Sequence, residues 1–317
     1  ICIKESIQSM AIAASTRALE NWHGKKEDLG LVIAATESSQ DLSRPLSAWV
    51  LEGLNLKGQI RSYEVKHACY GLTASIRQAI EWLNTQPDAK AALVVGADIA
   101  LYEPNSPGEP TQGAGSCAFI LENNPTIAEI DKQSFAYSAS AFDFWRPVHK
   151  PYPEVDGPLS LACYNEATLA CFRALAEKNT TPLFNLLDEY RFLAFHCPFP
   201  KMIFKSMQFL GEQHHWQTDE IKTCYHQKVL PTLKWNVEIG NAYTASLWFS
   251  VAKALSMMDK DEMLTAFSYG SGFGAELLTL KACSIKQAPW AAQLDTDLEQ
   301  RHLLSIEEYS RLRAENR

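Results

Sequence analysis

The amino-acid sequence predicts an α/β fold in which helices cover both faces of a largely parallel sheet. Two short, continuous apolar runs, 29–35 and 90–97, are typical of such strands, because each strand contacts an apolar layer on both sides. Segments with helical spacing of apolar residues alternate with these runs, as they do in layered α/β domains. The 317 residues are enough for about two domains, or for one large duplicated domain.

The first half of the chain alternates regularly between helices and strands. Residues 5–22 have helical apolar spacing that ends near Gly24. A helix is also expected over 43–54, because Pro45 falls in its first turn, where proline is tolerated. In chain order we expect helix 5–22, strand 29–35, helix 43–54, strand 59–65, helix 72–85 and strands 90–97, 115–121 and 126–131.

The second half follows a loop rich in aromatics and prolines, 140–158. There we expect helix 160–177, strand 192–195, helices 199–210 and 242–257, strands 262–268 and 273–281, and a helical segment over the last 30 residues. GAGSCAFIL at 113–121 and GSGFGAELL at 270–278 each place a Gly-X-Gly turn before an apolar strand. This weak repeat is consistent with two similar halves.

The composition argues against several classes of protein. Apolar residues make up 46% of the chain and charged residues 21%, and the net charge of −8 argues against nucleic-acid binding. The eight cysteines form no CxxC pair and no Cys/His metal spacing, so we expect reduced thiols in a cytoplasmic protein without a metal. No apolar run is long enough to span a membrane, and the first residues do not resemble a signal peptide.

Cys69 is the first candidate for chemistry, because it lies directly between a predicted strand and a predicted helix. Such a turn exposes the side chain, and the N–H groups at the start of the helix can stabilise a thiolate or an oxyanion. The alternative is a buried structural cysteine. Glu37 follows strand 29–35, at the sheet edge where α/β proteins place ligand sites, and burial there would raise its pKa toward a useful range. The alternative is a helix cap or a surface acid.

The other candidates lie in turns. His196 follows a short strand and precedes two prolines, so it is a possible donor or base, with a satisfied loop histidine as the alternative and His67 as a rival partner of Cys69. Asn241 and Ser271 lie in glycine-flanked turns, which allow a main chain to approach a ligand closely. No phosphate-binding loop and no GxGxxG in the right context is present, so nucleotide binding has no support.

Seven motifs occur in an order that resembles the 3-hydroxy-3-methylglutaryl-coenzyme A synthase family of the thiolase superfamily. They are ATES, KHACYG, GEPTQGAGS, FDFWRP…YPEVDGPLS, FHCPFPK, IGNAYTAS and FSYGSG, and the resemblance covers about residues 5–310. It implies a duplicated five-layered αβαβα sandwich, with an N-terminal half over 1–130 and a C-terminal half over 131–317, and a homodimer. The family begins before the position of Ile1, so the N-terminal part is expected to be incomplete.

The resemblance also implies roles for the candidate residues. The family's nucleophilic cysteine falls on Cys69, its acid/base glutamate on Glu37, and its acceptor-binding histidine on His196. The Gly-Asn turn falls on Asn241, a donor to the acceptor, and the Gly-Ser-Gly turn on Ser271, whose N–H would form an oxyanion hole with that of Cys69. Further polar positions of the family's substrate pocket fall on Tyr70, Asp98, Asp143 and Tyr243. No cofactor or metal is implied.

The activity implied is carbon–carbon bond formation between two acyl thioesters. Cys69 would hold an acetyl group, and Glu37 would deprotonate it for addition to a β-keto acyl acceptor. The version KHACYG is similar to the branch that adds a β-branch to polyketides on acyl carrier proteins, and Lys201 and Lys205 are candidates for docking such a carrier. The alternatives are a mevalonate-pathway enzyme using coenzyme A thioesters, a non-catalytic partner subunit, and a plain thiolase or ketosynthase.

Overall fold

Two sheets form the framework of the computed structural model, which describes residues 5–86, 91–283 and 288–315. The first sheet has the order β2-β1-β3-β4, and the second has the order β5-β11-β10-β9, with β6 also paired to β11. The strands of the first sheet are β1 (Leu29–Ala35), β2 (Arg61–Val65), β3 (Ala91–Ile99) and β4 (Ala114–Leu121). Those of the second sheet are β5 (Ala128–Ile130), β6 (Phe135–Ser138), β9 (Tyr190–Phe195), β10 (Met263–Gly270) and β11 (Gly274–Ala282).

The strands run parallel where the sequence predicts ligand sites. β1 pairs in parallel with both β2 and β3, and β9 pairs in parallel with β10. The outer pairs β3–β4 and β10–β11 are antiparallel. The carboxyl ends of β1 and β2 therefore meet at one edge of the first sheet.

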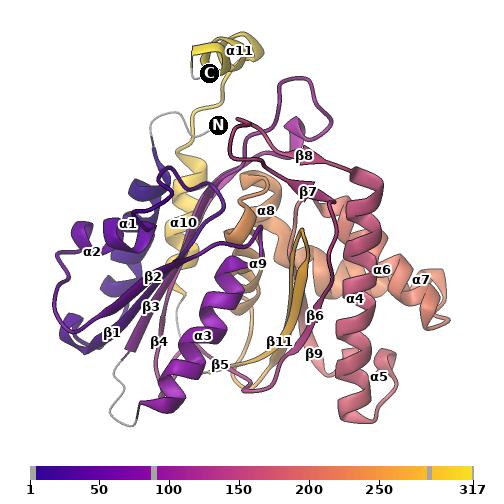
Figure 1. Ribbon diagram of the computed structural model, residues 1–317. Coiled ribbons are helices and arrows are strands. Elements are labelled where there is room, and N and C mark those ends of the chain that lie inside the picture. The colour runs from indigo at the N-terminus through magenta and orange to yellow at the C-terminus, as the bar shows by residue number, and fades with distance from the viewer. Residues whose placement is uncertain (1–4, 87–90, 284–287, 316–317) are drawn as a thin grey trace.

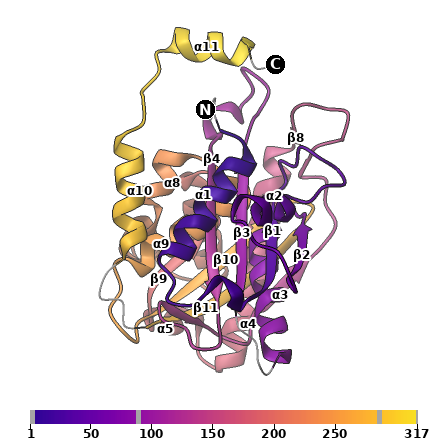
Figure 2. The ribbon, with the colours of Figure 1, turned by 90° about the vertical axis from the view of Figure 1, so that its left-hand side faces the viewer.

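Helices cover both sheets in five layers (Figures 1 and 2). The outer face of the first sheet carries α1 (Ile7–Glu20) and α2 (Leu46–Gly53). Between the sheets lie α3 (Gly71–Thr85) and α9 (Ser246–Leu255). The outer face of the second sheet carries α4 (Gly157–Asn179), α5 (Leu183–Asp188), α6 (Pro200–Gln213) and α7 (Thr218–Cys224). The predicted αβαβα sandwich is thus confirmed.

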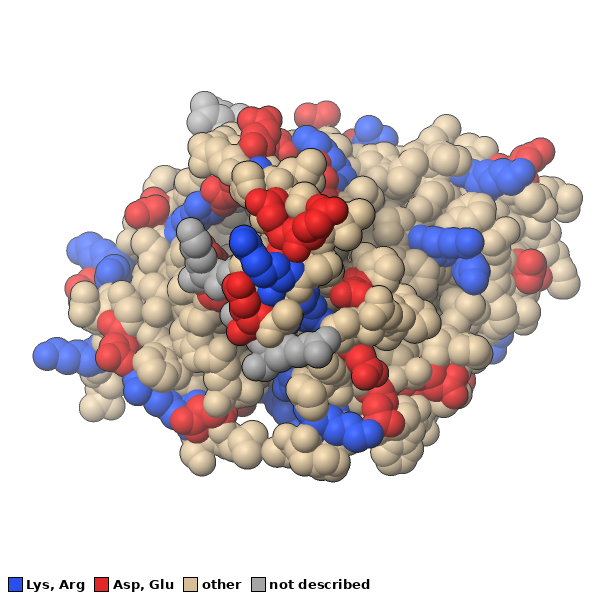
Figure 3. Space-filling view, turned by 90° about the horizontal axis from the view of Figure 1, so that it is seen from above, with Lys and Arg blue, Asp and Glu red and all other residues tan. Residues whose placement is uncertain are grey.

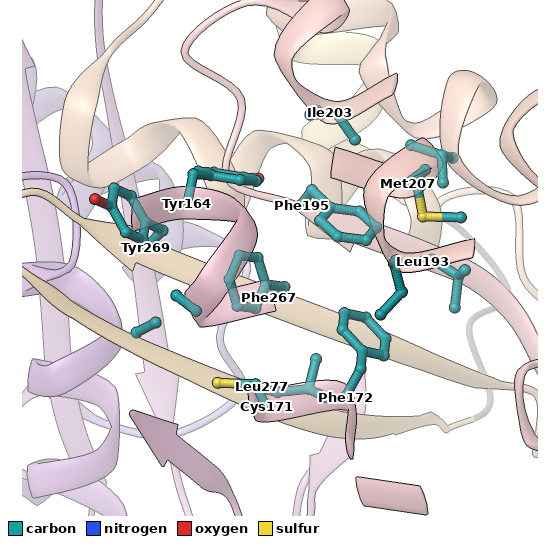
Figure 4. Close-up of a cluster of buried hydrophobic side chains, with 14 of the residues drawn as sticks. Tyr164, Cys171, Phe172, Leu193, Phe195, Ile203, Met207, Phe267, Tyr269 and Leu277 are labelled. Atoms are coloured by element: carbon teal, nitrogen blue, oxygen red, sulfur yellow. The ribbon is translucent and has the colours of Figure 1, made fainter. Parts of the chain in front are cut away.

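The side chains of β1 explain why a continuous apolar run is needed. Leu31 and Ile33 pack in the central helical layer, whereas Val32 and Ala34 pack against the outer helices. Successive side chains of a strand point to opposite faces, so a sheet with helices on both sides has few positions for polar residues. The second sheet follows the same rule, with Phe195 and Phe267 of adjacent strands packing into the outer core shown in Figure 4.

Several elements differ from the sequence-based expectation. The loop 140–158 contains a small hairpin of β7 (Phe144–Trp145) and β8 (Glu154–Val155). Beyond α7 the chain continues through a π-helical turn (Tyr225–Val229), a 3₁₀ turn (Leu230–Leu233) and α8 (Lys234–Ile239), which the sequence pattern does not predict. The C-terminal segment divides into α10 (Pro289–Glu299) and α11 (Ile306–Glu315). No helix in the described ranges is long and apolar enough to cross a membrane.

Candidate active site

Cys69 lies on a strained turn between β2 and α3. Its φ of +55° is in the left-handed region, which an L-residue other than glycine adopts only when its surroundings enforce it. The β10–β11 turn supplies that support, because a Cβ on Gly270 would lie only 1.8 Å from the carbonyl oxygen of Ala68. The turn is covered rather than open, and Cys69 is only 9% exposed, so the expectation of an exposed side chain is wrong.

Glu37 contacts Cys69 directly. Its Oε1 accepts a hydrogen bond from the Cys69 N–H at 2.8 Å and lies 3.4 Å from Cys69 Sγ. The two residues meet because each follows one of the parallel strands β1 and β2. A carboxylate and a thiol in contact can exchange one proton, which is the arrangement needed to activate a nucleophile or an acyl group bound to it.

The charge state of this pair follows from its burial. Burial, together with the nearby Asp98 carboxylate, raises the pKa of Glu37 to about 8. Burial and the negative charge of Glu37 raise the pKa of the Cys69 thiol. The prediction that the start of α3 stabilises a thiolate therefore does not hold for the ligand-free protein, because the Cys69 N–H is occupied by a carboxylate. Because both pKa values are raised, the thiol keeps its proton at neutral pH and most of the Glu37 carboxyl is protonated as well.

Asp98 fixes the turn that carries Glu37. One carboxylate oxygen accepts hydrogen bonds from the Glu37 N–H at 2.8 Å and the Thr36 hydroxyl at 2.9 Å, and the other accepts one from the Thr244 hydroxyl at 2.6 Å. The side chain is fully buried. The expectation that Asp98 lines the pocket is therefore corrected: it joins the turn after β1 to the turn before α9 from behind the site.

Tyr70 and Asp143 also point away from the pocket. The family resemblance implies a pocket position for Tyr70, but its hydroxyl donates to Glu276 on β11 at 2.6 Å. The buried Asp143 accepts hydrogen bonds from the Tyr269 hydroxyl and the Gly272 N–H, both at 2.9 Å. Both residues thus support the main chain of the site rather than present a polar group to a ligand.

Tyr243 packs beside Cys69 and also lines the neighbouring pocket. Its ring meets Tyr102 and Phe144 in edge contacts, with centroids 6.4 and 5.8 Å apart, and these residues pack with Cys69 in one cluster. An adjoining pocket is lined by Glu37, Phe144 and Tyr243, and further by Ile7, Ser38, Gln40, Ile99, Leu101, Arg146, Pro151 and Pro153. An aromatic wall beside a carboxylate suits a small acyl group better than a large charged one.

His196 lies at the carboxyl end of β9 and is 1% exposed. Its N–H donates to the Phe267 carbonyl at 2.8 Å, and its carbonyl accepts from the Tyr164 hydroxyl at 2.8 Å, so the main chain is fixed. Burial lowers the pKa of its imidazole to about 3, so the ring is neutral. Its Nδ1 has no hydrogen-bond partner within the described residues. The ring nitrogen can therefore take a hydrogen-bond partner, although His196 is not among the residues that line the pocket beside Glu37.

Asn241 and Ser271 lie in turns that approach other main-chain segments closely. A Cβ on Gly113 would lie 2.4 Å from the Ile239 carbonyl oxygen, so the first glycine turn packs onto the turn that carries Asn241. Asn241 Oδ1 accepts from the Tyr243 N–H at 2.9 Å, which leaves the amide NH₂ group as the end that can donate to a ligand. Ser271 lies in the turn after β10, and its main chain is hydrogen-bonded to His67.

The two lysines proposed for docking lie outside the pocket. Lys201 and Lys205 are both exposed on α6, one turn apart. Their placement fits a surface role, and neither is hydrogen-bonded to a site residue in the part of the chain that the structure describes. Within the described residues, no group of three or more His, Cys, Asp or Glu side chains could hold a metal ion.

Three residues of the site are absent from the sequence-based candidates. Arg146 donates to the Glu37 carbonyl at 2.9 Å, and Tyr102 and Phe144 complete the aromatic wall. Phe144 and Arg146 belong to the motif FDFWRP, of which only Asp143 is among the candidates. The motif FDFWRP could therefore have pointed to Phe144 and Arg146 as site residues. For Tyr102 the sequence offers only its position shortly after a strand.

The chain is similar to known proteins over nearly its whole length. Residues 1–126 match a family model described as hydroxymethylglutaryl-coenzyme A synthase N terminal, and 129–219 and 212–315 match the corresponding C-terminal model. A hydroxymethylglutaryl-CoA synthase of Enterococcus faecalis is 34% identical over 302 residues, which cover 92% of this chain and 75% of that protein. The polyketide biosynthesis 3-hydroxy-3-methylglutaryl-ACP synthase PksG of Bacillus subtilis (strain 168) is 31% identical over 308 residues, covering 91% and 72%.

A solved structure in complex with a coenzyme A thioester and one in complex with an acyl carrier protein resemble this fold equally well. MvaS in complex with 3-hydroxy-3-methylglutaryl coenzyme A has a TM-score of 0.87 at 31% identity, covering 97% of this chain and 80% of that one. The HMG synthase of the curacin biosynthetic pathway, in complex with acetyl donor-ACP, has a TM-score of 0.86 at 27% identity, covering 97% and 77%. The similarity therefore extends through both sheets and all five layers.

Proposed function

The chain belongs to the hydroxymethylglutaryl-CoA synthase family, an acyltransferase family that forms carbon–carbon bonds, and we propose that it condenses an acetyl group held on Cys69 with a β-keto acyl thioester. The observation that carries this proposal is the contact between Glu37 Oε1 and Cys69 Sγ at 3.4 Å in a buried site. A nucleophile and a base in contact are what the two steps of such a condensation need.

In the first step the Cys69 sulfur attacks the acetyl thioester of the donor. A new carbon–sulfur bond forms, the donor's carbon–sulfur bond breaks, and the thiol proton passes to the leaving donor thiolate. Glu37 contacts the thiol and can pass on that proton, but the step consumes one thiol and forms another, so it does not depend on this carboxyl as a base. The Cys69 N–H, released from Glu37, would donate to the thioester oxygen together with the N–H of Ser271.

In the second step Glu37 removes a proton from the acetyl methyl group. The carbanion adds to the β-keto carbon of the acceptor, whose oxygen takes up a proton, and water then cleaves the product from Cys69. The neutral His196 and the Asn241 amide would hold the acceptor's oxygens by hydrogen bonds. Tyr243, Tyr102 and Phe144 would exclude water from the carbanion. Asp98, Tyr70 and Asp143 would not contact the substrate, and their role would be to hold the turns that carry the site residues.

We propose the polyketide branch, in which acyl carrier proteins deliver the donor and the acceptor. The support is the motif KHACYG, together with the similarity to PksG and to the curacin enzyme. The second candidate is a mevalonate-pathway synthase that uses coenzyme A thioesters, which is favoured by the relative from Enterococcus faecalis. Both candidates share the chemistry above and differ only in the carrier.

Intact-mass analysis tests the proposal and separates its alternatives. The protein is incubated with acetyl-coenzyme A or with an acetylated carrier protein, and the acetyl adduct on Cys69 is located by peptide mapping. Faster labelling and turnover from the carrier protein supports the polyketide branch, and faster reaction of the coenzyme A thioester supports the mevalonate branch. No adduct from either donor would indicate a non-catalytic partner subunit.

The two halves and the oligomeric state are also proposals. We divide the chain into a half over 1–130 and a half over 131–317, because all strands of the first sheet lie within 29–121 and those of the second sheet lie within 135–282, except β5 (Ala128–Ile130), which pairs with the second sheet from the end of the first half. The central helices come from both halves, so neither half buries its inner face without the other. A homodimer, expected from the family, is tested by sedimentation equilibrium.

His196→Ala is expected to impair mainly the step that uses the acceptor. The ring is neutral and supplies hydrogen bonds rather than charge, so its loss should slow condensation by roughly a hundredfold or more and change acetylation of Cys69 only a few-fold. Single-turnover assays measure the two steps separately, with the exposed His226→Ala as the control. An equal loss of acetylation would make His196 a partner of Cys69 instead.

Lys201→Glu/Lys205→Glu is expected to weaken recognition of a carrier protein. Carrier proteins are typically acidic and this chain has a net charge of −8, so docking needs a local basic surface, which both exposed lysines of α6 can supply. The KM for a carrier-bound acyl group should rise much more than the KM for a small thioester mimic. The effect should shrink with added salt, since exposed charges are screened within about 10 Å at 0.1 M.

The control for this pair changes net charge equally elsewhere. Lys25 and Lys57 are exposed lysines at the outer layer of the first sheet, and Lys25→Glu/Lys57→Glu should leave the KM for the carrier nearly unchanged. Equal losses for the carrier and the mimic in the α6 variant would show that these lysines do not dock a carrier.

A further inference from the structure

The helix α11 lies apart from the five layers, at the top of the molecule in the view of Figure 1 (Figures 1 and 2). None of its residues is buried, and its first residue, Ile306, is 82% exposed. Leu303, in the segment that leads to it, is 92% exposed. In the view from above, acidic and basic side chains are mixed on this face rather than gathered by sign (Figure 3). The position of α11 is therefore set by specific contacts more than by a core of its own.

Arg313 makes the first of these contacts. Its side chain is only 9% exposed, and its guanidinium donates to the Tyr102 carbonyl oxygen at 2.5 Å. The same group lies 3.9 Å from the Glu109 carboxylate and stands over the Tyr152 ring at 5.5 Å. A buried guanidinium held by a carbonyl, a carboxylate and a ring has one preferred position.

Tyr309 makes the second contact, one turn earlier on α11. Its hydroxyl donates to Glu109 Oε1 at 2.5 Å and accepts from Gln112 Nε2 at 2.5 Å. The other oxygen of Glu109 accepts from the Asn105 N–H at 2.6 Å. Helix α11 thus holds the connection between β3 and β4 at both of its ends, at Tyr102 and at Gln112.

Both ends of this connection lead directly into the site. The Tyr102 ring contacts Phe144 and Tyr243 beside Cys69. At the other end, Gln112 forms a main-chain bridge with Asn241, and the Asn241 N–H donates to the Thr111 carbonyl at 2.9 Å. A shift of the connection would therefore move one wall of the pocket and the turn that carries Asn241 together.

We propose that Arg313 and Tyr309 are positioning residues that hold the acceptor side of the pocket through the segment 101–113. This inference rests on the proposed function for the identity of the acceptor, a β-keto acyl thioester. The side chains act on Tyr102, which packs against the pocket residues Phe144 and Tyr243, and on the turn that carries Asn241. Neither Arg313 nor Tyr309 is hydrogen-bonded to Glu37 or Cys69. Their effect falls on the acceptor, because the donor step needs only Cys69, Glu37 and the N–H groups of their turns.

The kinetic test compares Arg313→Gln with Arg311→Gln. Arg311 lies on the same helix with its side chain 67% exposed, in an ion pair with Glu315, so it is matched in position and charge. We expect Arg313→Gln to raise the KM for the acceptor about tenfold, the factor that about 1.4 kcal/mol represents, and to change the rate of Cys69 acetylation less than twofold. Arg313→Lys should restore part of the loss, since a lysine can still donate to the Tyr102 carbonyl. Arg311→Gln should behave as the unchanged protein.

A second measurement does not depend on activity. Hydrogen exchange of the amides in 101–113 should become at least several-fold faster in Arg313→Gln and in Tyr309→Phe, and stay unchanged in Arg311→Gln. The inference would be overturned if hydrogen exchange stayed unchanged in both Arg313→Gln and Tyr309→Phe. It would also be overturned if Arg313→Gln slowed the acetylation step and the acceptor step equally. If the unmodified protein takes up no acetyl group, the proposed function fails, while the exchange result still decides whether α11 holds this segment.

Discussion

Cys69→Ser is expected to abolish acetyl transfer and leave the fold intact. The hydroxyl of serine has a far higher pKa than a thiol, and the buried negative environment of Glu37 disfavours its ionisation further. Loss of the nucleophile should lower the rate of acetylation at least about a thousandfold. The left-handed main chain at position 69 is enforced by the packing of Gly270 against Ala68, and serine changes neither of them.

The measurement is intact mass after incubation with each acetyl donor, with thermal unfolding to check the fold. Cys224→Ser is a suitable control, because Cys224 is a free cysteine on α7, outside the site. That variant should gain one acetyl group like the unchanged protein. Condensation at a normal rate in Cys69→Ser would refute the nucleophilic role of this residue.

The layers of the fold could be predicted because β1 and β3 carry an unambiguous local pattern. Leu31 and Leu93 are apolar for different reasons, one facing the central helices and the other facing the outer helices, and together they give the continuous runs of buried strands. The segment 218–239 lacks such a pattern, since short helical turns of several kinds follow one another around Pro231. Strand β6 could not be predicted, because four residues with every second one exposed give too short a signal.

The centre of the site could be predicted for a related reason. Glu37 and Cys69 each follow a strand, and the carboxyl ends of parallel strands meet, so local sequence was enough to bring them together. The directions of other side chains depend on partners far along the chain. Tyr70 turns to Glu276 on β11, and Asp98 turns to Thr244, and no pattern near either residue indicates these partners.

The protonation state of Cys69 also could not be predicted from the local sequence. The start of α3 favours a thiolate on Cys69, and this local argument leads to the sequence-based expectation. In the folded protein the thiol also faces a buried carboxylate, and like charges in contact cannot both be ionised at little cost. The global arrangement therefore outweighs the local one, and the resting site keeps a proton.

Glu37→Gln is expected to accumulate acetyl-enzyme and to stop condensation. Glutamine removes the negative charge that raises the pKa of the Cys69 thiol, so the acetyl group should still be transferred to Cys69. An amide cannot take a proton from the acetyl methyl group, so the second step should fall about a thousandfold. Glu64→Gln is the matched control, because Glu64 is a partly buried carboxyl on β2 whose pKa is also raised by burial.

The pH dependence of condensation also tests whether Glu37 is the base. A base must be ionised to act, and the pKa of Glu37 is raised to about 8 by burial and Asp98. Below that value most of the free enzyme carries a protonated Glu37, so kcat/KM for condensation should rise with pH and level off above about 8. In Glu37→Gln the remaining slow rate should lose this limb, while Glu64→Gln should keep it. A profile that falls between about pH 6 and pH 8, or normal product formation by Glu37→Gln, would show that another group removes the proton.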